Sequence, residues 1–459
     1  MSETLRISQC MIVKNEEKNI ERALSWGRDI MWEQIVVDTG STDRTVELAQ
    51  KMGAKVFHFT WIDDFAAAKN YALEKAQGDW IAFLDADEYM EPDDVKKVYA
   101  LLSDFQKAAK PYLAVFTACI NLHKEGRVVS NTNQLRFFRN HADLRYAGRI
   151  HERLVKGDGT LDSSELFDAW SHLRIYHTGY TEEAYEETGK LKRNLDLIMK
   201  ELEEHPDDYK MMGNLADVYR AMGESELAIR WYEKAIESLP PVRRRSEAPI
   251  MRTTWSFVYL LYLLYEQKKG IGRALSVYEK AVQYIPQECD FDYIMGKYYI
   301  DLKDWERAIY HLERGLDLYR TDKSVYYGML LSPNLMSASE YLAICCYNAG
   351  KRDKCVHVSV TFLMTERFAM GILKVLLMAF AAEARALPVK TGAQGDSIQT
   401  QAAFAGQVLT VLGQLYDFTA LKDRLFVLKA ANEVQYGELA QVLQGLFSPE
   451  EQMLLSKMR

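Results

Sequence analysis

The sequence predicts an α/β domain built on a parallel sheet, followed by an all-α domain of stacked helical repeats. Strand-like apolar runs alternate with helical patterns up to Leu84, and strand patterns end near Glu182. Beyond that point, Pro206 and Pro240 stand 34 positions apart, a spacing typical of helical repeats. A chain of 459 residues also exceeds what one ordinary hydrophobic core serves, so we expect two or more domains.

Composition excludes several classes of function. The formal net charge of −8 argues against a nucleic-acid surface. The longest apolar run, residues 257–265, falls short of the roughly 20 residues that a membrane-spanning helix needs. The six cysteines form no Cys-x-x-Cys pair and match no histidine spacing, so neither a zinc site nor a disulfide framework is predicted. The polar opening of the chain does not resemble a signal peptide, and we expect a cytoplasmic protein.

Four apolar segments predict the strands of the first domain: residues 5–13, 34–37, 55–59 and 80–84. Helical patterns separate them. The first helix carries Ile20 and Leu24 on one face and is predicted to begin at a cap by Asn15, and the last spans residues 66–76. Single helices between consecutive strands are typical of βαβ units, which makes the sheet parallel. After Pro92, residues 112–121 and 133–139 predict an antiparallel pair.

The functional prediction depends first on Asp85-Ala86-Asp87, which directly follows the apolar residues 80–84. A strand that is apolar throughout is covered on both faces, and ligands bind at the carboxyl edge of open α/β sheets. A pair of carboxylates at that edge suits Mg²⁺, which proteins bind through one or two carboxylates plus substrate phosphates. The same residues also fit a solvated acidic turn. The choice between these two interpretations depends on the residues at the neighbouring strand ends.

Three strand ends direct polar residues to one edge of the predicted sheet: Asn15 and Glu16, Asp38 and Ser41, and Asp85 and Asp87. Such convergence predicts a nucleotide site, with Asp38 accepting from a base or ribose and the two later aspartates on ribose and a metal-bound diphosphate. Neither Gly-x-Gly-x-x-Gly nor a Walker loop is present, which disfavours dinucleotide and P-loop interpretations.

Three segments, in this order and spacing, resemble the inverting family 2 glycosyltransferases of the GT-A fold: Ile12-Val13-Lys14-Asn15-Glu16-Glu17, Val36-Val37-Asp38-Thr39-Gly40-Ser41-Thr42-Asp43 and Asp79-Trp80-Ile81-Ala82-Phe83-Leu84-Asp85-Ala86-Asp87. The resemblance implies a Rossmann-like GT-A domain over residues 1–185 that binds a nucleoside-diphosphate sugar, UDP-linked, with Mg²⁺ or Mn²⁺. It implies donor contacts from Val13, Asn15, Glu16, Asp38, Ser41, Lys69, Asp85, Ala86 and Asp87.

Two later stretches resemble bacterial family 2 enzymes, including those that glycosylate bacteriocin peptides: Gly148-Arg149-Ile150-His151-Glu152 and Tyr176-His177-Thr178-Gly179-Tyr180. Inverting transfer needs a base on the acceptor group, and Glu152 is the candidate; the alternative is a Glu paired with a nearby arginine. His177 is the candidate metal ligand beside Asp85 and Asp87, or else a core histidine bonded to a carbonyl. His151 could serve either role or orient Glu152.

The second half of the chain resembles tetratricopeptide repeats over residues 186–365. The first full copy has Met212, Leu215, Ala216, Tyr219, Ala228, Tyr232, Ala235 and Pro240. A second copy follows 46 residues on, the excess being an insertion around residues 243–249, and a third follows after a further 34. Stacked helix pairs leave a concave surface that can hold an extended peptide. Residues 366–459, with a polar linker at 388–400, could cap the repeats or mediate self-association, including a homodimer.

We therefore predict a metal-dependent, inverting glycosyltransferase that moves a sugar to a peptide or protein side chain held on the concave repeat face. A Cys, Ser or Thr side chain would serve as acceptor. One alternative is an enzyme of the same class that acts on a saccharide or lipid-linked glycan and uses the repeats for assembly. The other is a non-catalytic repeat scaffold with a nucleotide-binding domain.

Overall fold

The computed structural model describes residues 5–108, 111–123, 125–157, 159–178, 189–241, 251–321, 328–387 and 401–457. Several sequence predictions lie outside these residues: the end of the second resemblance stretch at Gly179-Tyr180, the domain boundary at 185, the insertion at 243–249 and the linker at 388–400. The described chain divides into two compact units, Met1–Ala228 and Ile229–Arg459.

The first unit is built on a parallel core sheet, as predicted. Strands β1 (Ile7–Val13), β2 (Glu33–Asp38), β3 (Lys55–His58) and β4 (Trp80–Phe83) lie in the order β3-β2-β1-β4, all parallel. They alternate with the helices α1 (Ile20–Ser25), α2 (Thr45–Lys51) and α3 (Phe65–Lys75), and α4 (Pro92–Lys107) follows. The three crossovers bring all four carboxyl ends to one edge.

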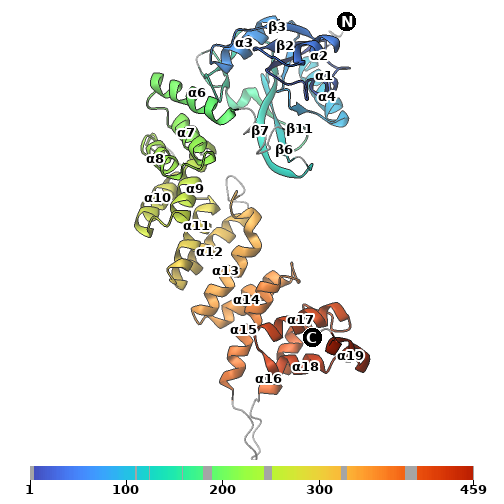
Figure 1. Cartoon of the computed structure of the whole chain (residues 1–459), viewed down its shortest axis with the longest axis vertical. Coiled ribbons are helices and arrows are strands. Elements are labelled where there is room, and N and C mark those ends of the chain that lie inside the picture. Colours follow the sequence, from blue (N-terminus) through green and yellow to red (C-terminus); the bar gives the residue numbers. More distant parts are fainter. Residues whose placement is uncertain are drawn as a thin grey trace, which may run out of the picture. The chain divides into compact units, whose positions relative to one another are not determined.

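Side chains alternate between the two faces of this sheet. Trp80 and Ala82 pack toward α4, whereas Ile81 and Phe83 pack toward α3. Met11 of β1 joins the core beneath α1 and α2. Helix α3 accordingly covers one face, and α1, α2 and α4 cover the other (Figure 1). Burial on both faces explains why these strands form continuous apolar runs in the sequence.

The rest of the sheet is mixed, and its full order is β3-β2-β1-β4-β7-β6-β11-β5, with β10 beside β6. The predicted antiparallel pair is confirmed as β6 (Ala114–Leu122) and β7 (Val128–Arg139). The short elements were not predicted: β5 (Glu88–Tyr89), β8 (Leu144–Ala147), β9 (Arg153–Lys156), the 3-10 helix η1 (Ser163–Glu165), β10 (Leu166–Asp168) and β11 (Arg174–His177).

Strand β11 places one predicted site residue. It runs parallel to β6, with His177 opposite Asn121, and antiparallel to β5, with His177 opposite Glu88. The backbone of Asp87 then accepts from the Thr178 amide at 3.1 Å. These pairings bring the end of β11 beside the end of β4, although the two are far apart in the sequence.

One local prediction is wrong: Asn15 does not cap the first helix. The residue that precedes α1 is Asn19, and Asn15 instead adopts a left-handed backbone conformation with φ of 57°. Asparagine tolerates this conformation better than most residues. The side-chain oxygen of Asn15 accepts from the Thr42 amide at 2.8 Å, so it serves the next loop rather than its own helix.

Two helices beyond the sheet also belong to the first unit, α6 (Lys190–Glu204) and α7 (Tyr209–Ala221). Polar contacts hold α6 to the sheet-containing part of this unit. Lys200 pairs with Asp63 at 2.5 Å, and Arg149 pairs with Glu204 at 2.5 Å. The Glu201 carboxylate, 9% exposed as a residue, accepts from the Arg149 amide at 3.4 Å.

The second unit is helical throughout its described residues, as predicted. Its helices include α9 (Met251–Glu266), α10 (Ile271–Tyr284), α11 (Cys289–Asp301), α12 (Trp305–Arg320), the 3-10 helix η2 (Ser332–Asn334), α13 (Leu335–Asn348) and α14 (Arg352–Leu363); α8 (Ser225–Glu237) spans the division between the units.

Small residues stand where neighbouring helices of the second unit meet. A Cβ added at Gly296 would lie 2.7 Å from Leu312, and one at Gly315 would lie 3.2 Å from the Cys289 carbonyl oxygen. Ala274 and Ala281 of α10 are fully buried. The repeat spacing seen in the sequence therefore marks the helix contacts themselves.

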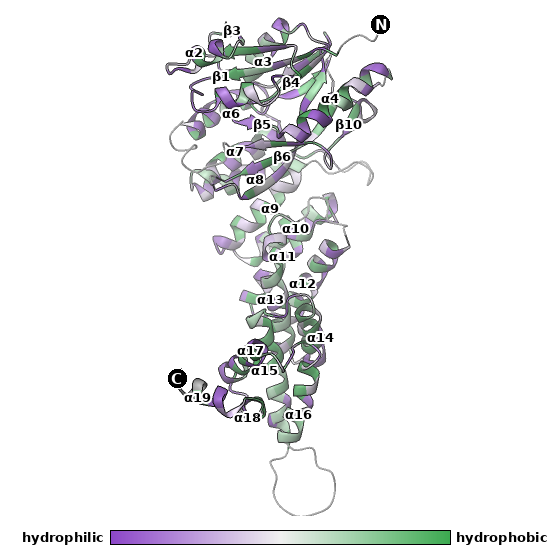
Figure 2. Ribbon diagram, turned by 90° about the vertical axis from the view of Figure 1, so that its right-hand side faces the viewer, coloured by the Kyte–Doolittle hydropathy of each residue, from purple (hydrophilic) through white to green (hydrophobic). Residues whose placement is uncertain are grey.

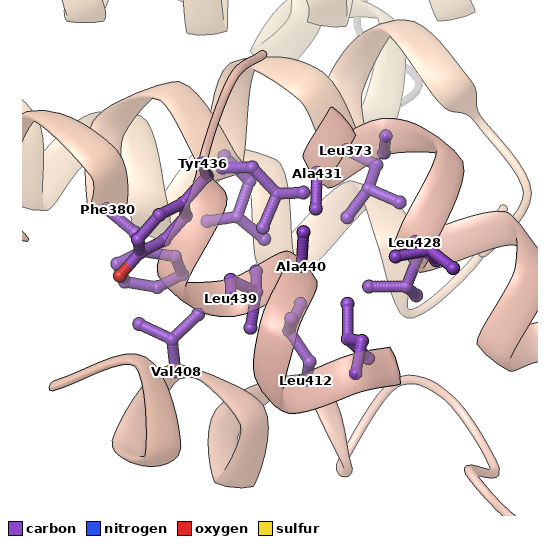
Figure 3. Close-up of a cluster of buried hydrophobic side chains, with 14 of the residues drawn as sticks. Leu373, Phe380, Val408, Leu412, Leu428, Ala431, Tyr436, Leu439 and Ala440 are labelled. Atoms are coloured by element: carbon purple, nitrogen blue, oxygen red, sulfur yellow. The ribbon is translucent and has the colours of Figure 1, made fainter. Parts of the chain in front are cut away.

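The C-terminal helices share one hydrophobic core. They are α15 (Met370–Ala386), α16 (Gln401–Leu412), α17 (Leu421–Glu433), α18 (Gly437–Gln444) and α19 (Pro449–Lys457). Figure 3 shows Leu373 and Phe380 meeting Val408, Leu428 and Leu439 from the other helices. Leu363 at the end of α14 belongs to the same cluster, which continues the repeat core into this region. Helices α15 and α16 are correspondingly drawn largely in green in Figure 2.

None of the helices in the described ranges combines the length and the apolar character needed to cross a membrane.

A buried carboxyl group in the second unit makes a testable prediction about stability. Asp290, 1% exposed, accepts from the Leu330 and Leu331 amides at 3.1 and 2.8 Å. Burial, and then the neighbouring Glu288, raise its pKa to about 7. Because this folded-state pKa lies above the unfolded value of about 3.9, the contribution to stability is complete at low pH and is lost as pH rises through 7.

We therefore expect the unfolding free energy of the wild type to fall by up to about 1.4 kcal/mol per pH unit between about pH 4 and 7 through this group. Asp290→Asn, whose amide oxygen can still accept from the two amides, should remove that component. Urea denaturation of both proteins across this range measures the difference. Parallel pH profiles would refute the prediction.

Candidate glycosyltransferase site

A cleft of about 1370 Å³ lies at the carboxyl edge of the parallel strands. Most of the predicted site residues line it: Val13, Asn15, Glu16, Lys69, Asp85, Ala86, Asp87, His151, Glu152 and His177. Asp38 and Ser41 are not in this lining. The cleft also includes residues that the sequence did not single out, from β6, β7 and α6.

Asp38 and Ser41 support the cleft by holding one of its loops. The Asp38 carboxylate, 4% exposed as a residue, accepts from the Gly40 and Ser41 amides at 3.2 and 3.0 Å. The Ser41 hydroxyl accepts from the backbone amide of Asn15 at 2.9 Å, and the Asn15 side-chain oxygen accepts from the backbone amide of Thr42. We call this exchange the Asn15–Thr42 clasp. It ties the loop after β1 to the loop after β2.

Asp85 lies between two cations. Its carboxylate is 3.0 Å from the guanidinium of Arg136 on β7 and 3.8 Å from Nζ of Lys69 on α3. Burial raises the pKa of Asp85, but Lys69 and Arg136 outweigh that effect and hold it well below its usual range. Asp85 is therefore ionised, with one oxygen facing each cation, and its side chain is 41% exposed.

Glu88 fixes the turn that carries the two aspartates. Its buried carboxylate accepts from the Asp85 amide at 2.9 Å and from Arg136 at 2.5 Å. Arg136 thus bridges Asp85 and Glu88. Removing this arginine would leave a buried, unpaired carboxylate, which is among the costliest changes in a protein interior.

Asp87 pairs with His177. Nε2 of His177 lies 3.1 Å from the Asp87 carboxylate, and Nδ1 lies 2.7 Å from the side-chain oxygen of Asn121. Because that oxygen only accepts, Nδ1 carries a proton. Nε2 then either donates to Asp87 as imidazolium or directs a lone pair to a cation shared with Asp87. Burial lowers the pKa of His177, but the bond to Asp87 and the nearby carboxylates outweigh burial and give a net increase in this pKa.

This donor set fits a divalent ion. A carboxylate oxygen and an imidazole nitrogen on one side leave the other positions to substrate oxygens and water. Asp85 belongs to a separate charge cluster with Lys69 and Arg136. Within the described residues, a closer set of three ligand-type groups exists only at Glu288, Cys289 and Asp290, at the buried start of α11 in the second unit.

Glu152 pairs with Lys69, and both residues line the cleft. Its carboxylate is 2.7 Å from Nζ of Lys69, and its side chain is 15% exposed. The sequence offers a nearby arginine as the alternative partner, but this lysine of α3 takes that place. Burial lowers the pKa of Lys69, but Asp85 and Glu152 outweigh it and raise the pKa above its usual value. His151 precedes Glu152 in a left-handed conformation with φ of 53°, and it lines the cleft.

Helix α6 contributes to the cleft wall through Lys190, Arg193 and Asn194. Glu16 lines the same cleft, and its pKa is raised by burial and by the nearby Asp87, against a lowering effect of Lys190. Sequence reasoning missed the residues of α6, and it also missed Arg136 and Asn121. The signal for Arg136 was present, since this arginine interrupts the apolar residues near the end of β7, between Leu135 and Phe137.

Comparison with known families agrees with this geometry. Residues 8–140 match the model of glycosyl transferase family 2, and residues 209–239 match a tetratricopeptide repeat. The chain joins a family 2 glycosyltransferase domain to tetratricopeptide repeats. The predicted family and fold class are confirmed.

Two relatives match longer stretches of the chain. A TPR repeat-containing protein of Synechococcus elongatus is 31% identical over 281 residues, covering 61% of this chain and 66% of the relative. The SPbeta prophage-derived glycosyltransferase SunS of Bacillus subtilis is 28% identical over 244 residues, covering 52% of this chain and 54% of SunS. The match thus spans less than two thirds of either relative. A solved structure, S. aureus TarS in complex with UDP-GlcNAc, is 17% identical, covers 61% of this chain and 92% of that chain, and has a TM-score of 0.35.

Proposed function

We propose that the protein transfers a sugar from a nucleoside-diphosphate sugar, UDP-linked, to a peptide or protein side chain, by a metal-dependent and inverting reaction. The observation that carries the proposal is the cleft itself. Within it, the Asp87–His177 pair lies beside a second cluster in which Asp85, Lys69 and Glu152 meet. The Asp87–His177 pair suits binding of a metal ion. The other cluster suits proton transfer from the acceptor and hydrogen bonding to the donor sugar.

Asp87 and His177 would hold Mg²⁺ or Mn²⁺. When bound, the ion offsets the negative charge that develops on the leaving diphosphate. Asp85, kept ionised by Lys69 and Arg136, is placed to accept hydrogen bonds from donor hydroxyls. The proposed donor contacts of Val13, Asn15 and Glu16 come from the end of β1 and the loop after it, whereas Asp38 and Ser41 act by holding that loop in place.

Glu152 is the proposed base. It would take the proton from the acceptor hydroxyl or thiol as that atom bonds to the anomeric carbon. The bond from this carbon to the diphosphate breaks at the same time, and its electron pair leaves with the diphosphate. Attack from the side opposite the leaving group inverts the anomeric centre. Lys69, whose Nζ lies 2.7 Å away, pairs with the Glu152 carboxylate and holds it in place. His151 orients its neighbour.

A surface on the repeats supports a peptide acceptor. Nζ of Lys297 on α11 lies 4.4 Å from the ring centre of Tyr265, 5.9 Å from Tyr293 and 6.0 Å from Tyr262. All but Tyr293 are half-buried and so reach solvent. Half-exposed tyrosines beside a cation are typical of surfaces that bind peptides, because their rigid rings offer contact area and hydroxyl groups.

We place the protein in the cytoplasm. All six cysteines fall in described segments, and none of them is in a disulfide. Buried, reduced thiols are what a reducing compartment favours.

The test has two steps. First, the protein is incubated with several UDP- and GDP-sugars and Mn²⁺, and release of nucleoside diphosphate is followed alongside titration of UDP with and without metal. We expect one donor to be hydrolysed slowly and UDP binding to require the metal. Absence of any nucleotide binding would overturn the proposal in favour of a repeat scaffold.

In the second step, the hydrolysed donor is offered with peptides containing Cys, Ser or Thr and, separately, with oligosaccharides. Mass spectrometry detects the added sugar. A modified peptide is the expected product. Transfer to oligosaccharides alone would replace the peptide acceptor with a glycan and assign the repeats to assembly.

A further inference from the structure

Helix α6 forms part of the catalytic cleft although it begins well past residue 140, where the family match ends. Its first turns supply three lining residues, Lys190, Arg193 and Asn194. The guanidinium of Arg193 lies 5.1 Å from the ring centre of Phe65, another lining residue. The cleft wall therefore includes a helix of the region predicted to be repeats.

The position of α6 is fixed by contacts along its length. Further down the helix, Lys200 pairs with Asp63, and Glu201 and Glu204 both bond to Arg149. Asp63 lies just before Phe65, and the Phe65 amide donates to the Arg149 carbonyl at 2.8 Å. These contacts orient the first turns of α6 toward the cleft.

Charge indicates what this wall would hold. The cleft contains the carboxylates of Glu16, Asp85, Asp87 and Glu152. Of the cations that line the cleft, Lys69 and Arg136 are already committed to Asp85, Glu152 and Glu88. Lys14 and Lys18 of the loop after β1 also line it, as do the cations of α6. A nucleoside diphosphate adds further negative charge to this surface. One divalent ion offsets only part of it, so additional cations in the cleft wall are needed.

We propose that Lys190 and Arg193 bind the diphosphate of the donor, so that α6 completes the catalytic cleft. The inference rests on the proposed function and adds two binding residues to it. Lysine acts as a point charge toward phosphate, and arginine adds directional paired donors. The same cations could instead bind a carboxylate of the acceptor, and the experiment separates these two sources.

The experiment measures binding of UDP and of uridine to the full chain, with Mn²⁺ present, by calorimetry. Lys190→Gln and Arg193→Gln should each weaken UDP binding roughly tenfold, as expected for loss of one charge-assisted contact. Uridine, which lacks the diphosphate, should bind the variants and the wild type equally. Lys192→Gln is the matched control, because this exposed lysine of the same helix does not line the cleft. It should bind UDP like the wild type.

Unchanged UDP affinity in a variant that combines Lys190→Gln with Arg193→Gln would overturn the inference. If that result came with a higher KM for the peptide acceptor, the cations would serve the acceptor instead. If the wild type bound neither UDP nor uridine, both the proposed function and this inference would fall. If the wild type and the variants bound UDP equally well, the inference alone would fall. Circular dichroism checks that α6 is retained, and glutamine and lysine have similar helix propensities.

Discussion

Asp87→Ala is expected to lower sugar transfer by at least about 10³-fold, because it removes one of the two proposed protein ligands to the metal. The Asp87 carboxylate and Nε2 of His177, 3.1 Å apart, are the two groups that would bind the metal. The variant should therefore also lose the metal-dependent part of UDP binding. Steady-state transfer rates and UDP titrations with and without Mn²⁺ provide both measurements.

Asp93→Ala is the matched control for this prediction. Asp93 lies close in sequence on α4, and its side chain is 86% exposed. It pairs with Lys96 at 3.7 Å, and such an exposed ion pair contributes little to stability. A rate close to that of the wild type is expected. If Asp87→Ala retained metal-dependent UDP binding, Asp87 would not be a metal ligand.

Glu152→Gln is expected to reduce transfer by roughly 10²- to 10⁴-fold, the usual range for loss of a general base. Donor binding should stay within about twofold of the wild type, because glutamine keeps an oxygen that can accept from Lys69. The comparison of transfer rates with UDP affinity separates a chemical role from a structural one.

Glu74→Gln serves as the control for Glu152. Glu74 is exposed on α3, the helix that carries Lys69. A Glu152→Gln protein with a nearly normal rate would show that Glu152 only pairs with Lys69. A Glu152→Gln protein that loses rate and UDP affinity equally would point to the same structural role.

The core sheet could be predicted because its strands are buried on both faces. Trp80 to Phe83 contains no charged residue, and such apolar runs are visible in the sequence. The strands Glu88–Tyr89 and Arg174–His177 interleave polar residues and carry no such pattern. Their pairing depends on which chain segments lie alongside them, and this is decided by tertiary packing rather than by local sequence.

The site was predictable to the same extent. Residues that closely follow buried strands, such as Asp85 and Asp87, could be assigned to one sheet edge from the strand pattern alone. The contact of Lys69 with Glu152 could not, because no spacing rule relates a residue of α3 to one that follows β8. Lys190 was missed for a related reason: a helical pattern shows which face is apolar, but it does not show which cleft the polar face borders.

The Asn15–Thr42 clasp has a consequence for how selectively a nucleotide would be recognised. Two loops that would otherwise move separately are joined by hydrogen bonds in both directions, and a left-handed residue sets the direction of one of them. Their shared conformation exists before any ligand arrives. The two loops should then bind a nucleotide as a preorganised site. Little conformational entropy would be lost on binding, and a nucleotide with a differently shaped base would be poorly tolerated. Loosening the clasp would widen the range of accepted nucleotides while weakening each one.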